Sequence, residues 1–396
     1  MQKAYKLHGK HRHYDWGGNL FIPSLMKVEN KDQKPFAEYW MGAHPSAPSI
    51  IDTELGETDL NSLIQKEPTI YLGTTTQNSF GTLPYLFKIL DVAKMLSIQV
   101  HPSKENAVIG FDLENKAGIA IDASNRNYKD KNHKPEVMVA LSDFWLLHGF
   151  LAPHLLDARL QEYFYFNPLL DHFRGVDYQG LYSFFMQLSS ADSDRILKPL
   201  MMDAVASVKR GEVDKSHPHW WANKYYEGII PEKNIDKGIF SIYILNIVQV
   251  AKYQAVFQGA GLLHAYLEGQ NIELMANSDN VLRGGLTPKH IDIDELLKHV
   301  KFVPTYPNVL NGEALNEIET IYPCPVADFG LSKIAIDGGK DYTIHTNSLE
   351  MLLVVEGKIS IEGLAFTAGE VAMIPAAQTV QIQAGVDSVL FKSFVP

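Results

Sequence analysis

The chain has 396 residues, of which 46% are hydrophobic and 11% aromatic, so it can bury substantial cores and exceeds what one core usually serves. Its formal net charge of −11 argues against a broad nucleic-acid surface, which needs clustered Lys and Arg. The start carries no apolar segment of signal-peptide length, and no run approaches the roughly 20 apolar residues that span a bilayer. Because Cys324 is the single cysteine, an internal disulfide is excluded. We expect a globular cytoplasmic protein of two or three domains, without nucleic-acid or membrane partners.

The first predicted elements are short. The N-terminal histidines 8, 11 and 13 are expected to be structural or surface residues, because the following Trp-Gly-Gly indicates a turn. Asp59 to Ile64 predicts a short helix capped by Thr58 or Asp59. Two strands follow, at 85–90 and 95–101, and their close succession suggests an antiparallel sheet.

The second of these strands carries the first sign of chemistry. Apolar Leu, Ile and Val alternate with Ser97, Gln99 and His101, so an extended chain places these three polar side chains on one face. An imidazole and an amide oxygen two residues apart form half of a metal site. Other segments must supply the remaining ligands.

In the middle of the chain, the spacing of the apolar residues changes from a strand period to a helix period. Ser103 is expected to cap a helix after Pro102, and residues 153 to about 228 follow a period of 3.6, which predicts an inserted helical domain. One helix in it is expected to begin near Ser193. His217 and His219 flank a proline, which favours a helix entry over a pair of metal ligands.

Two later segments complete the candidate metal site. Glu136 begins a β-rich run after Pro135, and His264 follows a turn marked by Gly259 and Gly261. Strands are predicted over 239–257 and a helix over 292–300. Two imidazoles and a carboxylate suit zinc, and would equally fit Mn, Co or Fe(II).

The tail from about 322 to 396 predicts a second β unit. Short apolar runs are broken by Gly-containing turns at steady spacing, as in a small jelly roll. It contains one histidine, His345, so we expect no second metal site there.

Six motifs, in order, carry a resemblance to a known family. They are His13 to Gly17 (HYDWG), Ala37 to Pro45 (AEYWMGAHP), Leu83 to Leu90 (LPYLFKIL), Ser97 to Pro102 (SIQVHP), Asn132 to Glu136 (NHKPE), and the block from His264 (HAY) to Lys289 (LTPK). In these the chain resembles the type I mannose-6-phosphate isomerases of the cupin superfamily. The resemblance implies a mainly β fold with an inserted α-helical domain. It consists of a catalytic cupin jelly roll (1–150 and 235–320), a helical insertion (151–234) and a C-terminal jelly roll (321–396).

The resemblance also implies an activity and a set of site residues. The family interconverts mannose 6-phosphate and fructose 6-phosphate through a cis-enediol-like species, with one zinc ion per chain. The implied residues are Gln99, His101, Glu136 and His264 as metal ligands; Arg283 as enediolate stabiliser; Glu273 as base or acid, with Lys134 and Asp279 as rivals; and Ser97, Lys88, Lys134 and Tyr266 around the substrate. Lys289 is a further cation for the phosphate. The partner is then a small sugar phosphate, and the chain a monomer or a homodimer.

Two other functions remain open at this stage. A His, Glu, His set around Fe(II) would suit a cupin oxygenase. A cupin that binds sugar without turnover is the second alternative, disfavoured by Glu273 and Arg283. Metal analysis and an anaerobic assay with mannose 6-phosphate would separate the three.

Overall fold

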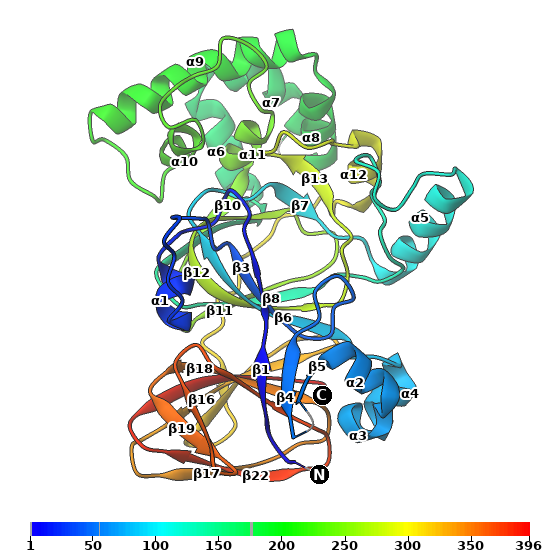
Figure 1. Cartoon of the computed structure of the whole chain (residues 1–396). Coiled ribbons are helices and arrows are strands. Elements are labelled where there is room, and N and C mark those ends of the chain that lie inside the picture. The colour runs from blue at the N-terminus through cyan, green and yellow to red at the C-terminus, as the bar shows by residue number, and fades with distance from the viewer. Residues whose placement is uncertain (1, 55, 175–176) are drawn as a thin grey trace.

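The computed structural model describes residues 2–54, 56–174 and 177–396. It has three tiers: helices at the top, a barrel of strands in the middle and the C-terminal strands at the bottom (Figure 1). The predicted class, mainly β with an inserted helical region, is confirmed. No helix in the described ranges is long and apolar enough to cross a membrane.

The middle tier is an antiparallel sheet organised around one long strand. Its strands are β2 (Lys10–Arg12), β3 (Glu38–Met41), β6 (Tyr85–Val92), β7 (Ile98–Val100), β8 (Glu136–Ala140), β9 (Phe144–Phe150), β10 (Leu245–Val250), β11 (Ala255–Gln258), β12 (His264–Ala276) and β13 (Leu282–Gly285). With 13 residues, β12 is long enough for two partners on each edge: β7 and β9 near His264, then β6 and β8 along its second half. Gly269, at a φ of 124°, bends β12 between these halves and lets Phe144 approach closely.

The strands predicted at 85–90 and 95–101 both exist, and the antiparallel sheet that they suggested is confirmed. The second strand is shorter than predicted, and the two do not pair with each other. The edges of β6 are occupied by β3 and β12, so the chain crosses over and β7 pairs with β12 and β13 instead.

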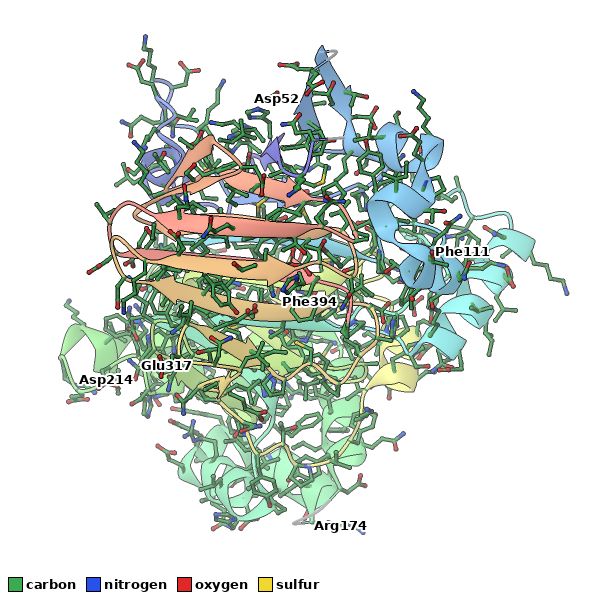
Figure 2. The ribbon with its side chains drawn as sticks, turned by 90° about the horizontal axis from the view of Figure 1, so that it is seen from below. Asp52, Phe111, Arg174, Asp214, Glu317 and Phe394 are labelled. Atoms are coloured by element: carbon green, nitrogen blue, oxygen red, sulfur yellow. The ribbon has the colours of Figure 1, made fainter. Side chains whose placement is uncertain are left out.

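The bottom tier holds the predicted C-terminal strands and adds N-terminal ones. One sheet contains β14 (Glu313–Ala314), β15 (Glu319–Tyr322), β16 (Gly330–Ile336), β23 (Ser388–Phe394), β18 (Glu350–Glu356), β21 (Val371–Ile374), β1 (Tyr5–His8), β4 (Ile50–Thr53) and β5 (Gly56–Asp59), in that order. The other contains β17 (Asp341–His345), β22 (Thr379–Ala384), β19 (Lys358–Ile361) and β20 (Leu364–Thr367). The predicted domain boundaries remain a prediction, and β1, β4 and β5 join the C-terminal sheet although they lie within 1–150. Figure 2 shows this tier from below, with Phe394 of β23 near the middle of the view.

The helices are α1 (Phe21–Met26), α2 (Leu60–Lys66), α3 (Pro68–Leu72), α4 (Thr74–Phe80), α5 (Lys104–Lys116), α6 (Pro153–Glu162), the 3-10 helix η1 (Phe164–Phe166), α7 (Asn167–Phe173), α8 (Tyr178–Gln187), α9 (Ser190–Lys209), α10 (Pro218–Tyr225), α11 (Gly238–Ile244) and α12 (Ile293–His299). Asp59 and Ser103 cap α2 and α5 as predicted, and His217 caps α10. Helix α9 begins three residues before the predicted Ser193, because Ser189 accepts the N–H of Asp192.

The predicted strand over 239–257 is wrong in its first part. Residues 238–244 form α11, and every residue in it is buried. A short apolar run buried on all sides has no polar alternation, so its period cannot separate strand from helix.

The helical tier fixes which way β7 faces. Ile98 and Val100 pack into the buried apolar cluster formed with helices α6 to α11. Because side chains alternate along a strand, Gln99 and His101 then point away from that cluster, into the barrel.

Candidate metal centre

Four side chains form a row across neighbouring strands of the barrel. His264 on β12 lies opposite Gln99 on β7 and His148 on β9, and Gln99 lies opposite Arg283 on β13. Residues directly opposite in an antiparallel pair share a face and have Cβ atoms roughly 4.5 to 5.5 Å apart. The register therefore brings together Arg283, Gln99 and His264, which lie far apart in the sequence.

Three ligand atoms converge beside this row. The Nε2 atoms of His101 and His264 lie 3.4 and 3.3 Å from the two carboxylate oxygens of Glu136. All three side chains are buried, and their potential ligand atoms lie within 4.8 Å of one another. Neither Nε2 atom has a hydrogen-bond partner among the described residues. Two buried, unpartnered imidazole nitrogens facing one carboxylate match the needs of a divalent cation.

Main-chain acceptors orient both imidazoles. Nδ1 of His101 lies 2.8 Å from the carbonyl oxygen of Asn280, and Nδ1 of His264 lies 2.9 Å from that of Leu262. Donation from Nδ1–H leaves the Nε2 lone pair facing inward, as in other metal-binding histidines.

Electrostatics favours the metal-binding protonation states of His101 and Glu136. Burial lowers the pKa of His101 to about 4, although Glu136 opposes this shift. Burial alone would raise the pKa of Glu136, but Lys134 and His101 hold it well below its ordinary value. At neutral pH the site therefore offers neutral imidazole and ionised carboxylate.

Arg283 and Ser97 present unengaged polar groups near the row. The guanidinium of Arg283 is half-buried and makes no hydrogen bond or ion pair with any residue in the described part of the chain, and the hydroxyl of Ser97 makes none either. Burial lowers the pKa of Arg283. Burial also lowers the pKa of Lys289, and the charges of Arg283 and Lys129 add to that shift. A cationic region thus borders the centre.

A second buried cluster surrounds Glu273. Its Oε2 lies 3.0 Å from Nζ of Lys88, and its Oε1 accepts a 2.8 Å hydrogen bond from the hydroxyl of Tyr266. Lys88 also lies 3.7 Å from Glu38, and its Nζ lies over the ring of Trp40. Burial raises the pKa of Glu273 even though Lys88 lowers it. For Lys88, burial acts to lower the pKa, but Glu273 and Glu38 raise it overall. The predicted substrate residues Lys88 and Tyr266 are therefore already bound to the predicted base.

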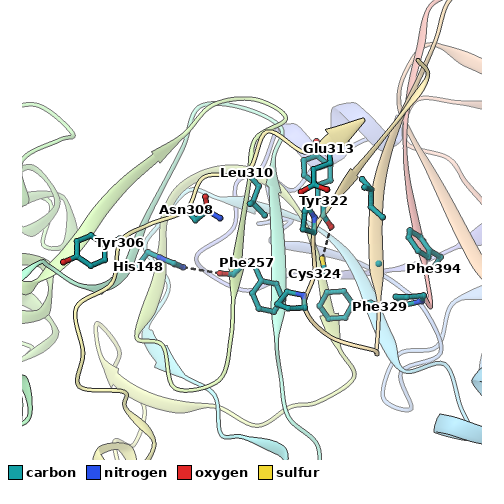
Figure 3. Close-up of a pocket in the computed structure, with 15 residues that line it drawn as sticks. His148, Phe257, Tyr306, Asn308, Leu310, Glu313, Tyr322, Cys324, Phe329 and Phe394 are labelled. Atoms are coloured by element: carbon teal, nitrogen blue, oxygen red, sulfur yellow. Dashed lines mark hydrogen bonds between the residues drawn. The ribbon is translucent and has the colours of Figure 1, made fainter. Parts of the chain in front are cut away.

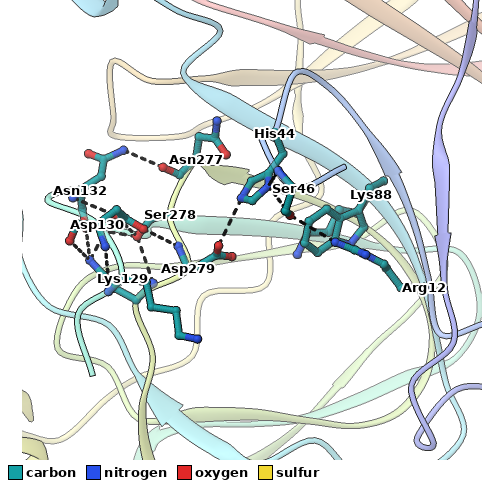
Figure 4. A network of polar contacts seen from close by, with 12 residues as sticks. Arg12, His44, Ser46, Lys88, Lys129, Asp130, Asn132, Asn277, Ser278 and Asp279 are labelled. Carbon is teal, nitrogen blue, oxygen red and sulfur yellow. Dashed lines mark hydrogen bonds and ion pairs between the residues drawn. The ribbon is translucent and has the colours of Figure 1, made fainter. Parts of the chain in front are cut away.

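The other two predicted proton-transfer residues are also paired. Nζ of Lys134 lies 3.2 Å from Glu136. The half-exposed carboxylate of Asp279 lies 3.4 Å from Nε2 of His44, and a hydrogen bond from His44 holds the pKa of Asp279 below its ordinary value (Figure 4).

A cavity of about 650 Å³ lies between the barrel and the C-terminal sheet (Figure 3). His148 lines it, as do Phe257, Phe394 and Cys324, and burial raises the pKa of the Cys324 thiol to about 12. None of the predicted metal ligands is among the described residues that line this cavity. The metal centre is thus not part of the cavity.

Several residues of the site were not predicted from the sequence. Glu38 and His44 both lie in the Ala37 to Pro45 motif, so that motif was the available signal, but it assigned no role to either residue. The role of Asn280 depends on its main-chain oxygen, which no side-chain pattern reveals.

Comparison with known proteins agrees with the geometry. Residues 4–152 match the family model for the catalytic domain of type I phosphomannose isomerase. The mannose-6-phosphate isomerase of Salmonella typhimurium is 38% identical over 386 residues, covering 94% of this chain and 95% of that protein. The Mus musculus enzyme is 31% identical over 405 residues, covering 95% and 90%. A crystal structure of the Salmonella enzyme bound to its substrate, fructose 6-phosphate, and a zinc atom superposes with a TM-score of 0.89, at 35% identity, over 100% of both chains.

Proposed function

Because this chain belongs to the type I phosphomannose isomerase family, we propose that it interconverts mannose 6-phosphate and fructose 6-phosphate with one zinc ion held by Gln99, His101, Glu136 and His264. The observation that carries the proposal is the pair of buried Nε2 atoms, both without a partner among the described residues, that face the oxygens of Glu136. Gln99 is proposed as the fourth ligand; its pairing with His264 and its position on the face of His101 support this role.

Bound zinc would act as a Lewis acid that polarises the sugar carbonyl and lowers the cost of the negative charge developing on its oxygen. The remaining steps belong to the chain's own residues. Arg283 lies opposite Gln99, with its guanidinium unpaired among the described residues. A permanently charged, forked donor there stabilises the enediolate as hydrogen moves between C1 and C2.

Glu273 is the proposed general base and acid. A carboxyl group with a raised pKa accepts a carbon-bound proton from one carbon and returns it to the next more readily than one ionised far below neutral pH. Tyr266 and Lys88 hold its two oxygens and set its direction. Asp279 and Lys134 are the rivals. Asp279 accepts a hydrogen bond from His44 and Lys134 forms an ion pair with Glu136, so each is less free to transfer a proton.

The phosphate is proposed to bind at the cationic border. Ser97 offers an unengaged hydroxyl directly before β7, the strand of Gln99, and Lys289 lies close enough to Arg283 for their charges to interact. Lys88 and Lys134 are proposed to help position the phosphate as well, and both also balance buried carboxylates.

Two further proposals concern the whole chain. The division at 150, 234 and 320 is proposed with the amendment that β1, β4 and β5 belong with the C-terminal unit, because they pair with its strands. The chain is proposed to act as a monomer, since the ligands and neighbouring groups named above all come from one chain.

The test is an anaerobic coupled assay that follows fructose 6-phosphate formed from mannose 6-phosphate, together with metal analysis of the purified protein. We expect turnover without oxygen and about one zinc per chain. Turnover that requires oxygen would support a cupin oxygenase instead, and sugar binding without turnover would support a binding protein.

A further inference from the structure

The loop of residues 277–281 between β12 and β13 bears directly on a metal ligand. Its Asn280 carbonyl accepts the hydrogen bond from Nδ1 of His101 at 2.8 Å, so the position of this one oxygen sets the direction of the imidazole. A displaced carbonyl would leave the ring free to rotate away from Glu136. What holds the loop therefore also holds the metal ligand.

Asn280 is clamped to the segment that precedes Glu136. Its fully buried side-chain amide donates to the main-chain oxygens of Asp130 and Asn132, at 2.8 and 2.9 Å. Its side-chain oxygen accepts the main-chain N–H groups of Lys129 and Asp130, at 2.7 and 3.2 Å. This amide ties residues 129–132 to the 277–281 loop.

The carboxylate of Asp130 completes the clamp (Figure 4). It accepts the N–H of Asp279 at 2.7 Å, the hydroxyl of Ser278 at 2.8 Å, the N–H of Asn132 at 2.9 Å and the side-chain amide of Asn280 at 3.2 Å. Three of these donors meet Oδ1 and the N–H of Asp279 meets Oδ2, and an ionised carboxylate, which has no hydrogen of its own, accepts all four. An amide at this position would point an N–H group at one of these donors.

We propose that Asp130 is a positioning residue for the metal centre, which fixes the zinc ligand His101 through the 277–281 loop. The inference rests on the proposed function, since it takes zinc as the resident ion. The same clamp joins the two segments that supply Lys134 and Glu136 on one side and Asp279 and Arg283 on the other. The half-buried side chain of Asp130 bonds to the loop and its neighbours and to none of the four proposed ligands, so it acts only through the loop.

The experiment measures the zinc dissociation constant by competition with a chromophoric chelator. The variants are Asp130→Asn, which removes the charge and keeps the shape, and Ser278→Ala, which removes one donor from the clamp. Asp52→Asn is the matched control, because Asp52 pairs with His8 at an exposed site on β4. The thermal midpoint of each zinc-free protein reports on folding alone.

We expect Asp130→Asn to bind zinc about 10- to 100-fold more weakly than the wild type. Ser278→Ala should bind it several-fold more weakly, and Asp52→Asn should match the wild type. The zinc-free midpoints of Ser278→Ala and the wild type should agree closely. Excess zinc should restore zinc occupancy in Asp130→Asn, which an unfolded protein would not show.

The inference is overturned if folded Asp130→Asn and Ser278→Ala bind zinc within twofold of the wild type. If Asp130→Asn does not fold, Ser278→Ala decides alone by the same criterion. A wild type that fails to retain zinc would instead overturn the proposed function, so the two failures are distinguishable.

Discussion

Lys88 and Glu273 form a buried ion pair, and we expect the loss of Lys88 to destabilise the protein more than the loss of the Glu273 charge. Both residues are at most 5% exposed, and the ammonium also lies 3.7 Å from Glu38. Lys88→Met therefore leaves two buried carboxylates without their cation. Glu273→Gln leaves Lys88 with Glu38, and the glutamine oxygen can still accept from Tyr266.

The expected losses of unfolding free energy therefore differ between the two variants. Removing one partner of a buried ion pair costs roughly 3 to 5 kcal/mol, and we expect Lys88→Met to reach this range. The unfolding midpoint should then fall by roughly 6 to 20 °C, at 2 to 4 °C per kcal/mol for a domain of 150 to 250 residues. Glu273→Gln should cost only about 1 to 3 kcal/mol, as for the loss of a charged hydrogen bond.

The pH dependence of the Lys88→Met variant follows from the sign of the shift at Glu273. Burial already raises the pKa of Glu273 above its ordinary 4.5, and loss of Lys88 raises it further. An acid whose pKa is higher in the folded state binds protons more readily there, so protonation stabilises the fold. The loss of unfolding free energy in Lys88→Met is therefore largest at a pH above the raised pKa of Glu273. It becomes smaller as the pH falls below that pKa towards 4.5.

Calorimetry of zinc-loaded protein at pH 8 and pH 5.5 measures both effects. Lys31→Met is the control, because Lys31 pairs with Glu29 at a site where both side chains are more than 70% exposed. Such a pair is worth about 0 to 1 kcal/mol, so its midpoint should hardly move. Equal losses of stability for Lys88→Met and Glu273→Gln, or a Lys88→Met loss that grows at pH 5.5, would show that Lys88 does not balance both buried carboxylates.

Three further predictions concern activity. Arg283→Ala should lower kcat roughly 100- to 1,000-fold with little change in KM, because its donor acts on charge that develops during the reaction; an unaltered kcat in steady-state assays would remove Arg283 from the mechanism. Gln99→Ala should lose zinc faster than the wild type during dialysis against a chelator, while excess zinc restores turnover; equal retention would show that Gln99 is not a ligand. His44→Leu removes the hydrogen bond that lowers the pKa of Asp279, so that pKa should rise. If Asp279 must be ionised for turnover, the low-pH limb of kcat/KM moves to higher pH; an unmoved limb would exclude Asp279 from proton transfer.

Part of the proposed site could be predicted because two of its four proposed ligands, Gln99 and His101, lie in one stretch with clear alternation. Ile98 and Val100 had to face the helical tier, so the pattern alone placed Gln99 and His101 on the opposite face. His264 and Glu136 were predicted as metal ligands from the sequence motifs that contain them, and not from the periodicity of apolar residues. Glu136 lies opposite Met275, at the other end of β12 from His264, so strand register alone does not predict that their side chains meet.

The features that could not be predicted arise from non-local pairing and burial. The α11 segment is apolar on every side, so its sequence carries no period. The pairing of β1 with β21 joins residues more than 360 positions apart, and no local pattern encodes it. The partners of Lys88 were also hidden, because a lysine in an apolar strand does not show which carboxylates it will meet.

The most direct test of the proposed zinc site is anomalous scattering at the zinc edge from crystals of the wild-type protein grown with zinc. We expect one strong peak inside the barrel, about 2.0 to 2.2 Å from Nε2 of His101, Nε2 of His264 and an oxygen of Glu136. The side-chain oxygen of Gln99 should be the fourth ligand. A peak elsewhere, or any of these four side chains turned away from the ion, would contradict it.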